Sequence, residues 1–89
     1  MPAKFQLGRL LITPGALGKL SGIDTERALA RHVSGDWGDV CPEDARTNER
    51  ALVEDARLLS VYRGDSGTKF WIITEADRSA TTILLPSEY

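Results

Sequence analysis

Cysteine is nearly absent from this chain, because Cys41 is the only one among its 89 residues. A disulfide within the chain is therefore excluded, and a metal cluster held by several thiolates is not expected. Cys41 stands directly before Pro42, where we expect a helix to begin. A thiolate is favoured at a helix N-terminus, but the interpretation we prefer is a half-buried structural residue.

The sequence also lacks long apolar runs. No stretch is long enough to cross a bilayer, and the N-terminal segment MPAKFQLGRL lacks the apolar core of a signal peptide. We therefore expect a cytoplasmic protein with no membrane partner.

Neither sign of charge dominates the chain. It has 11 Lys and Arg against 13 Asp and Glu, a formal net charge of -2. A protein that grips nucleic-acid phosphates usually presents a clustered positive field, and a DNA mimic would need a dense acidic surface. The charges here are interspersed, so nucleic acid is not the partner that the composition favours.

The composition that remains is that of an ordinary globular protein, with 42% hydrophobic and 27% charged residues. The length suits one domain, which we assign to residues 1–89. The C-terminal part organises the chain. Its three apolar segments predict an antiparallel meander with strands at Leu58–Tyr62, Thr68–Thr74 and Ala80–Leu85.

The middle segment of this meander predicts a central strand. Phe70 and Ile72 alternate with Trp71 and Ile73, so both faces of the strand are apolar. The segment Gly64–Gly67 before it is a strong hairpin signal. Such a strand is covered on both sides, or it is covered on one side and used for contact on the other.

The N-terminal half predicts one further strand and three helices that cover the sheet. Phe5–Ile12 is expected to be a strand with one well-buried side, in which Gly8 marks a bulge or a close backbone approach. Cap residues and prolines predict helices at Pro14–Leu20, from a cap at Asp24 or Thr25 to Ser34-Gly35, and at Pro42–Ala56. The predicted fold class is therefore α+β, a small antiparallel sheet of about four strands packed with about three helices.

The loop between the second and third predicted helices is the first candidate site. Here Asp36 and Asp39 flank Trp37, and together they could hold a divalent cation or present an aromatic anchor to a partner. In the alternative interpretation, Asp39 caps the third helix and Trp37 folds back onto the core, since Asp and Gly are common loop residues. The loop lacks an oxygen ligand at every second position, which a calcium site needs, so no metal is assigned.

The second candidate site is the corner between the last two predicted strands. Glu75, Asp77 and Arg78 could serve as acid, base and anion clamp, or they could form a salt-bridged turn. Because this corner is dense in charge and adjoins an aromatic strand, we interpret it as a binding surface. The candidate partner-binding residues are Asp36, Trp37, Asp39, Trp71, Glu75, Asp77 and Arg78, with no catalytic residue and no cofactor assigned.

Other residues leave alternatives open. His32 is the only histidine and could pair with Asp36 for acid–base work, although a lone histidine at a helix end more often supports the helix dipole or packs on the surface. A small metal-dependent hydrolase or nuclease would use Asp36, Asp39, Glu43 and Asp77. A nucleic-acid-binding module would use Arg63, Lys69, Trp71 and Arg78.

Three segments carry a resemblance over nearly the whole chain: LGRLLITPGAL, RHVSGDWGDV and GTKFWIITEADRSATTILLPSEY. They resemble a family of small bacterial proteins carried by plasmids and other mobile elements, some of which are labelled as the modification subunit of a type I restriction system. A methyltransferase subunit needs a cofactor-binding α/β domain and a target-recognition region, and 89 residues cannot hold both. The resemblance therefore implies a mobile-DNA setting and no particular activity.

The sequence thus favours a non-enzymatic binding or accessory protein of mobile elements that acts through a protein partner. Small size and the lack of a recognisable catalytic motif favour this function over an enzyme. A homodimer formed through an uncovered sheet face or edge is also compatible with so small a core.

Overall fold

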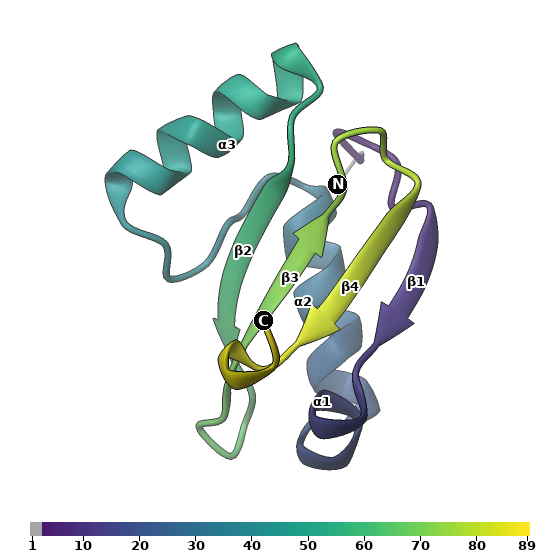
Figure 1. Cartoon of the computed structure of the whole chain (residues 1–89). Helices are drawn as coiled ribbons and strands as arrows, with labels where there is room; N and C mark the ends of the chain where they lie inside the picture. Colours follow the sequence, from purple (N-terminus) through teal and green to yellow (C-terminus); the bar gives the residue numbers. More distant parts are fainter. Residues whose placement is uncertain (1–2) are drawn as a thin grey trace.

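The secondary structure confirms the predicted α+β class. A computed structural model describes residues 3–89, and its elements in chain order are β1 (Arg9–Ile12), α1 (Pro14–Lys19), α2 (Gly22–Val33), α3 (Pro42–Glu54), β2 (Leu58–Arg63), β3 (Lys69–Thr74), β4 (Ala80–Leu84) and the 3-10 turn η1 (Pro86–Glu88) (Figure 1). Most element ends lie within one or two residues of the predicted ones, which is the usual uncertainty at helix and strand ends.

The four strands form one sheet in the order β1-β4-β3-β2. Strands β2, β3 and β4 make the predicted antiparallel meander. Strand β1 pairs with β4 in parallel, so the sheet is mixed rather than wholly antiparallel. Parallel neighbours need a long crossover, and here the crossover is most of the chain, from α1 to β3. The apolar pattern of a strand is the same in both directions, so the sequence did not indicate this orientation.

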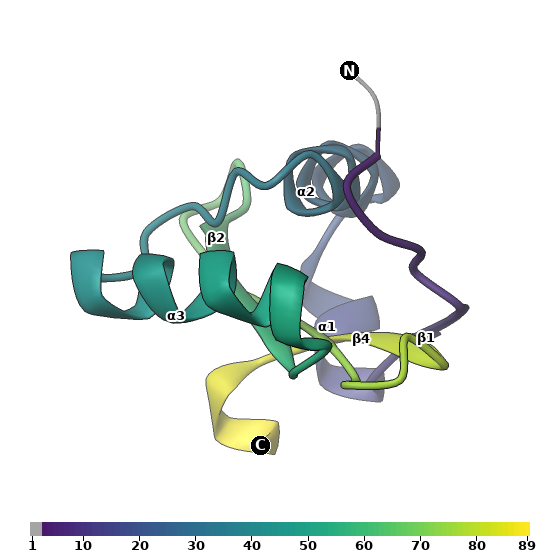
Figure 2. The same cartoon turned by 90° about the horizontal axis from the view of Figure 1, so that it is seen from above.

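The two faces of β3 have different coverings, as its pattern predicted. Phe70 and Ile72 point to the side of the sheet where α1 and α2 pack, and their core cluster also contains Ala16, Ala28, Tyr62 and Ile83. Trp71 points to the opposite face, where its ring meets that of Tyr89. Figure 2 shows η1 and the C-terminus across the sheet from α2. β3 is therefore central and covered on both faces.

Strand β1 departs most from its prediction. Only Arg9–Ile12 is a strand, and all four of its residues are exposed, so the expected well-buried side is wrong. Phe5 leaves the line of the strand and packs edge-on against the ring of His32. Gly8 makes the predicted close backbone approach: its φ is +66°, and a Cβ at this position would overlap with the carbonyl oxygen of Arg78.

Helix α2 starts upstream of the predicted cap. Ser21 is the N-cap, because its hydroxyl accepts the N–H of Asp24 while the Asp24 carboxylate accepts the N–H of Ser21. This reciprocal pair is a capping box, which makes Asp24 the third helical residue and not the cap. Helix α1 starts as predicted, with Thr13 as N-cap and Pro14 in the first turn.

The outer edge of β2 is closed by groups that do not belong to a strand. The Asn48 side chain on α3 accepts the N–H of Leu59 at 3.1 Å and donates to the carbonyl of Leu59 at 2.7 Å. Farther along the edge, the N–H of Val61 donates to the carbonyl of Trp37 at 3.1 Å, and the N–H of Asp39 donates to the carbonyl of Val61 at 2.8 Å. Asn48 and the loop thus take the place of a neighbouring strand.

Replacing Asn48 by alanine is expected to lower the free energy of unfolding by about 2 kcal/mol, because two hydrogen bonds to the backbone of Leu59 are lost. Urea unfolding followed by circular dichroism would measure the change. Arg46→Ala, at an exposed position of the same helix, is the matched control and should change stability by no more than about 0.5 kcal/mol. Equal unfolding midpoints for the two variants would contradict this role of Asn48.

Candidate functional site

The predicted aromatic anchor, Trp37, lies inside the fold. Only 5% of its surface is exposed, and its ring stacks on Phe5 with 6.3 Å between the centroids. Its Nε1 donates a hydrogen bond to the Glu49 carboxylate at 2.8 Å. The structure thus matches the alternative in which Trp37 folds back onto the core, and a partner cannot reach the ring in this conformation.

The two aspartates of the loop fasten it to its neighbours. The Asp36 carboxylate accepts hydrogen bonds from the Arg31 guanidinium at 2.7 and 3.1 Å, and this partner holds the pKa of Asp36 below its usual value. The hydroxyl of Tyr62 donates to the carbonyl oxygen of Asp36.

Asp39 lies 3.9 Å from Arg63, and both side chains are exposed, so this pair contributes little to stability. Asp39 does not cap α3, because the N-cap is Cys41, whose side chain is exposed rather than half-buried.

The charged corner is a salt-bridged turn. The Asp77 carboxylate accepts the N–H of Ser79 at 2.9 Å, and hydrogen bonds from Ser79 lower the pKa of Asp77. Glu75 pairs with Arg57 at 3.5 Å. The structural alternative is therefore correct in that Asp77 accepts a backbone N–H of the turn. The ion pair is made by Glu75 with Arg57, just before β2, whereas Arg78 does not pair with a carboxylate as that alternative expected.

Arg78 closes the C-terminal end of α3. Its guanidinium donates to the carbonyl of Ala51 at 3.0 Å and to that of Ala56 at 2.6 Å. These carbonyls lie in and just beyond the last turn of the helix. That of Ala51 already accepts the N–H groups of Asp55 and Ala56, so Arg78 adds a further donor there. Arg78 has a φ of +60°, a conformation that is uncommon for a non-glycine residue. Its guanidinium is therefore committed to the backbone.

His32 is the centre of a buried polar chain that the sequence did not predict. Its side chain is fully buried, with Nδ1 2.5 Å from the hydroxyl of Ser60 and Nε2 2.9 Å from the hydroxyl of Thr74. Thr74 lies 2.8 Å from Thr81, which donates to the carbonyl of Leu7 at 2.7 Å. The chain links α2 to three strands and to the segment before β1.

The direction of these hydrogen bonds follows from their end point. The carbonyl of Leu7 can only accept, so the hydroxyl of Thr81 donates to it and accepts from Thr74. Thr74 then accepts from His32 Nε2–H, which leaves Nδ1 to accept from Ser60. Burial lowers the pKa of His32 to about 4, with a smaller contribution from the positive charge of Arg78, so the ring is neutral near pH 7, as an accepting Nδ1 requires.

Neither predicted role of His32 is correct. It is not on the surface, and its two ring nitrogens bond to Ser60 and Thr74 rather than to Asp36. A usable signal was present in the strands. Ser60, Thr74 and Thr81 fall on the inner face of the meander, and polar residues on an inner face require buried partners.

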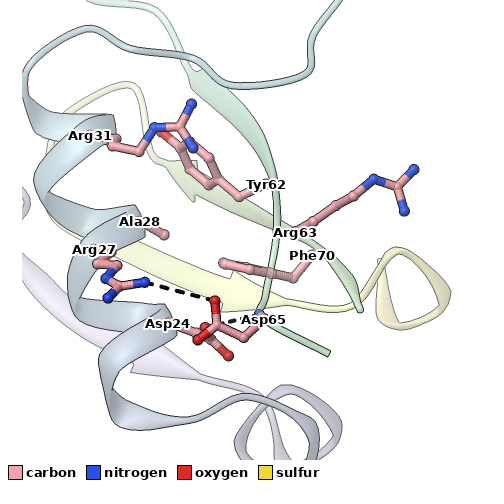
Figure 3. Close-up of a pocket in the computed structure, with 8 residues that line it drawn as sticks. All are labelled: Asp24, Arg27, Ala28, Arg31, Tyr62, Arg63, Asp65 and Phe70. Carbon is pink, nitrogen blue, oxygen red and sulfur yellow. Dashed lines mark hydrogen bonds and ion pairs between the residues drawn. The ribbon is translucent and has the colours of Figure 1, made fainter. Parts of the chain in front are cut away.

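A hollow of about 180 Å³ lies between α2 and the hairpin that joins β2 to β3 (Figure 3). Phe70 and Tyr62 form part of its wall, and the Arg31 guanidinium lies 4.8 Å from the centroid of the Tyr62 ring. Figure 3 shows the Arg63 side chain directed away from Arg31. Ligand sites usually enclose about 300 Å³ or more, so this hollow is small for a metabolite.

The charges around the hollow are already paired. Arg27 lies 3.7 Å from Asp65, and the N–H of Asp65 donates to Asp24 at 3.1 Å (Figure 3). The Asp24 carboxylate accepts hydrogen bonds from the backbone N–H groups of Asp65 and of Ser21, and these bonds lower its pKa. An incoming anion would have to compete with these carboxylates for the arginines. We therefore assign the hollow a structural role.

The structure also places the residues of the two alternative functions. Among residues 3–89, no group of three or more His, Cys, Asp or Glu side chains is arranged to hold a metal ion. Of the nucleic-acid set, Arg63, Lys69 and Trp71 share one face of the sheet by strand register. Arg78 is instead bound to the end of α3.

The surface that sequence reasoning missed is the outer edge of β1. Leu10, Leu11 and Ile12 are 53%, 44% and 37% exposed, although all three are large and apolar. The N–H of Arg9 donates to the carbonyl of Ser79, just before β4, and that of Thr13 donates to the carbonyl of Ile83 in β4. Because these groups alternate along a strand, the N–H and C=O groups of Leu10 and Ile12 point outward, away from the sheet.

The position of β1 at the edge depends on strand order, which local pattern does not specify. The alternating apolar residues of Phe5–Ile12 predicted one well-buried side of the strand for that reason. The signal that could have indicated an edge is the shortness of the strand between Gly8 and Pro14. Natural edge strands are often short.

Comparisons with known proteins add no relative to this picture. No protein-family model matches the chain, no curated protein is significantly similar to it, and no solved structure matches it. None of the helices in residues 3–89 has both the length and the apolar character needed to cross a bilayer.

Proposed function

We propose that this protein is a non-enzymatic binding protein that acts through a protein partner, and that the partner adds a strand to the open edge of β1. The exposed apolar edge is the observation that carries the proposal. The setting we propose, bacterial mobile elements, comes from the family resemblance of the sequence.

An edge strand presents unpaired backbone groups that can pair with another chain. Proteins that avoid such pairing usually place charges or proline on the edge, or cover it. In this sheet β2 is covered by Asn48 and the loop at Gly38, whereas β1 exposes three apolar residues in a row. An extended segment added to β1 would gain main-chain hydrogen bonds, which supply affinity, and contacts to alternate side chains, which supply specificity.

The roles of the polar residues also support binding over catalysis. His32 is neutral and buried, Asp36 is paired with Arg31, and Arg78 bonds to the end of α3. These three groups thus have structural partners that a substrate would have to displace.

We expect affinity capture with a tagged chain from the native host, read by mass spectrometry, to recover a partner that depends on the β1 edge, either another protein or the untagged native copy of this chain. Leu11→Lys should reduce the recovered partner by at least about tenfold, because it places a charge in a strand–strand contact. Val53→Lys, at an 84% exposed position on α3, introduces the same side chain away from the edge and should recover the partner normally. Equal recovery by both variants, or turnover of a substrate by the purified protein, would contradict the proposal.

A further inference from the structure

We infer that the strand added to β1 is β1 of a second copy of this chain, paired antiparallel about a two-fold axis at Leu11. The inference rests on the proposed function, since it uses the same edge and names its occupant. The result is a symmetric dimer with a continuous sheet across both copies.

The outward backbone groups of β1 select this register. Leu10 and Ile12 carry the outward N–H and C=O groups, so a partner strand must place outward groups opposite both of them. With the axis at Leu11, Leu10 of one copy faces Ile12 of the other, and Ile12 faces Leu10. Both pairs then exchange two hydrogen bonds, four in all. An axis at Ile12 would instead place Leu10 opposite Pro14, which has no N–H to donate. An axis at Leu10 would place Ile12 opposite Gly8, which lies outside β1 and has a φ of +66° rather than strand geometry.

The side chains agree with this register. Leu10 and Ile12 pair in register with Thr81 and Ile83, so they share the sheet face on which α1 and α2 pack. The two copies therefore bring Leu10 against Ile12 on that face. Leu11 meets its own counterpart on the opposite face as a non-hydrogen-bonded pair, the closer kind of cross-strand pair. Apolar side chains that are exposed in one copy are thus covered in two.

The charges are also complementary in this arrangement. Arg9 has an exposed side chain with no ion-pair or side-chain hydrogen-bond partner among residues 3–89. In the proposed register Arg9 faces Thr13 of the second copy, on the same sheet face as Leu11. The Thr13 hydroxyl bonds to the Glu88 carboxylate within its own copy. The symmetric pair therefore places a guanidinium from each copy near a carboxylate of the other, and no like charges oppose each other.

Sedimentation equilibrium of the purified chain across the micromolar range tests the second copy directly. The wild-type chain should be a dimer, and Leu11→Lys should raise its dissociation constant at least about tenfold, because two lysines would then oppose each other at the axis. Val53→Lys should leave the dimer unchanged. Leu10→Pro is a second test of the dimer, because it removes two of the four hydrogen bonds between the copies. The fold of each copy should tolerate this proline, since the N–H of an edge position faces solvent. Circular dichroism checks that each variant is folded.

A cross-linking experiment tests the register. In a Cys41→Ser background, Leu11→Cys should form an intermolecular disulfide under oxidised glutathione, because the two Cβ atoms of a non-hydrogen-bonded pair lie close together. Leu10→Cys would face Ile12 instead, so we expect it to cross-link at least about tenfold more slowly. Equal rates would overturn the register. A wild-type chain that stays monomeric would contradict the inference that the added strand comes from a second copy. The capture experiment with Leu11→Lys would still test the proposed function independently.

Discussion

Replacing Gly38 by alanine is expected to lower the free energy of unfolding by about 3–4 kcal/mol, which is a large part of the stability of a small domain. Gly38 has a φ of +75°, and a Cβ there would overlap with the carbonyl oxygen of Val61 and lie 2.7 Å from the Tyr62 ring. The left-handed conformation costs an alanine about 1–2 kcal/mol, and forced overpacking adds about 1–3 kcal/mol. The substitution would also push the loop away from the edge of β2.

Gly67→Ala separates the two contributions. Gly67 has a φ of +86° in the hairpin between β2 and β3, but no atom lies within 4 Å of the position its Cβ would take. The variant should therefore lose only the conformational contribution, about 1–2 kcal/mol. Urea unfolding of both variants measures the difference. If Gly38→Ala were no less stable than Gly67→Ala, the close approach to β2 would not be a tight contact in solution.

Mild acid is expected to weaken the fold through His32. In the unfolded chain its pKa is near 6.5, whereas burial lowers it to about 4 in the folded state. Between these two values the unfolded chain binds the proton and the folded chain does not, so stability rises with pH across this interval. The free energy of unfolding should therefore fall as the pH is lowered from about 7 to about 4, by about 3 kcal/mol in total.

The carboxylates act in a lower pH range and can be separated from this effect. Asp24, Asp36, Asp77 and Glu88 have pKa values below their usual ones, so the stability they contribute is lost only as the pH falls through about 4 and below. Urea unfolding at a series of pH values, compared with His32→Gln, isolates the histidine, because glutamine does not titrate. The variant should lose the dependence above about pH 4.5. An NMR titration that placed the His32 imidazole near its ordinary pKa would contradict the prediction.

The C-terminal meander was predictable because its information is local. Alternation of Phe70 and Ile72 with Trp71 and Ile73 specified two apolar faces, and the glycines at Gly64 and Gly67 specified the hairpin. A strand with two apolar faces has to be covered on both, which made β3 central in the sheet. Proline and cap residues located the helices for the same reason.

The errors concern relations between distant segments. The run Leu10-Leu11-Ile12 has the composition of an interior strand, and only strand order places it at an edge in parallel with β4. His32 is surrounded by hydroxyls from β2, β3 and β4, which no spacing around it in the sequence reveals. The same holds for Arg78, whose carbonyl partners include Ala51, 27 positions earlier in the chain.

Several of the candidate partner-binding residues make structural contacts for a related reason. Charged loop residues such as Asp36, Asp77 and Arg78 are common at binding sites, but they are equally suited to bonding backbone groups at turns and helix ends. In this chain they do the latter. The feature that favours an interaction is an apolar strand with nothing beside it, which depends on the assembled sheet.

The β2 edge of the sheet is covered and the β1 edge is open, and this difference limits how large an assembly can become. A sheet with two free sides can recruit neighbours without end and extend into filaments. Here the Asn48 amide and the segment at Gly38 occupy the backbone groups on the β2 side. In the proposed dimer the two β1 strands cover each other, so both outer edges of the combined sheet are β2 edges. We therefore expect growth to stop at two copies, without aggregation through the apolar strand.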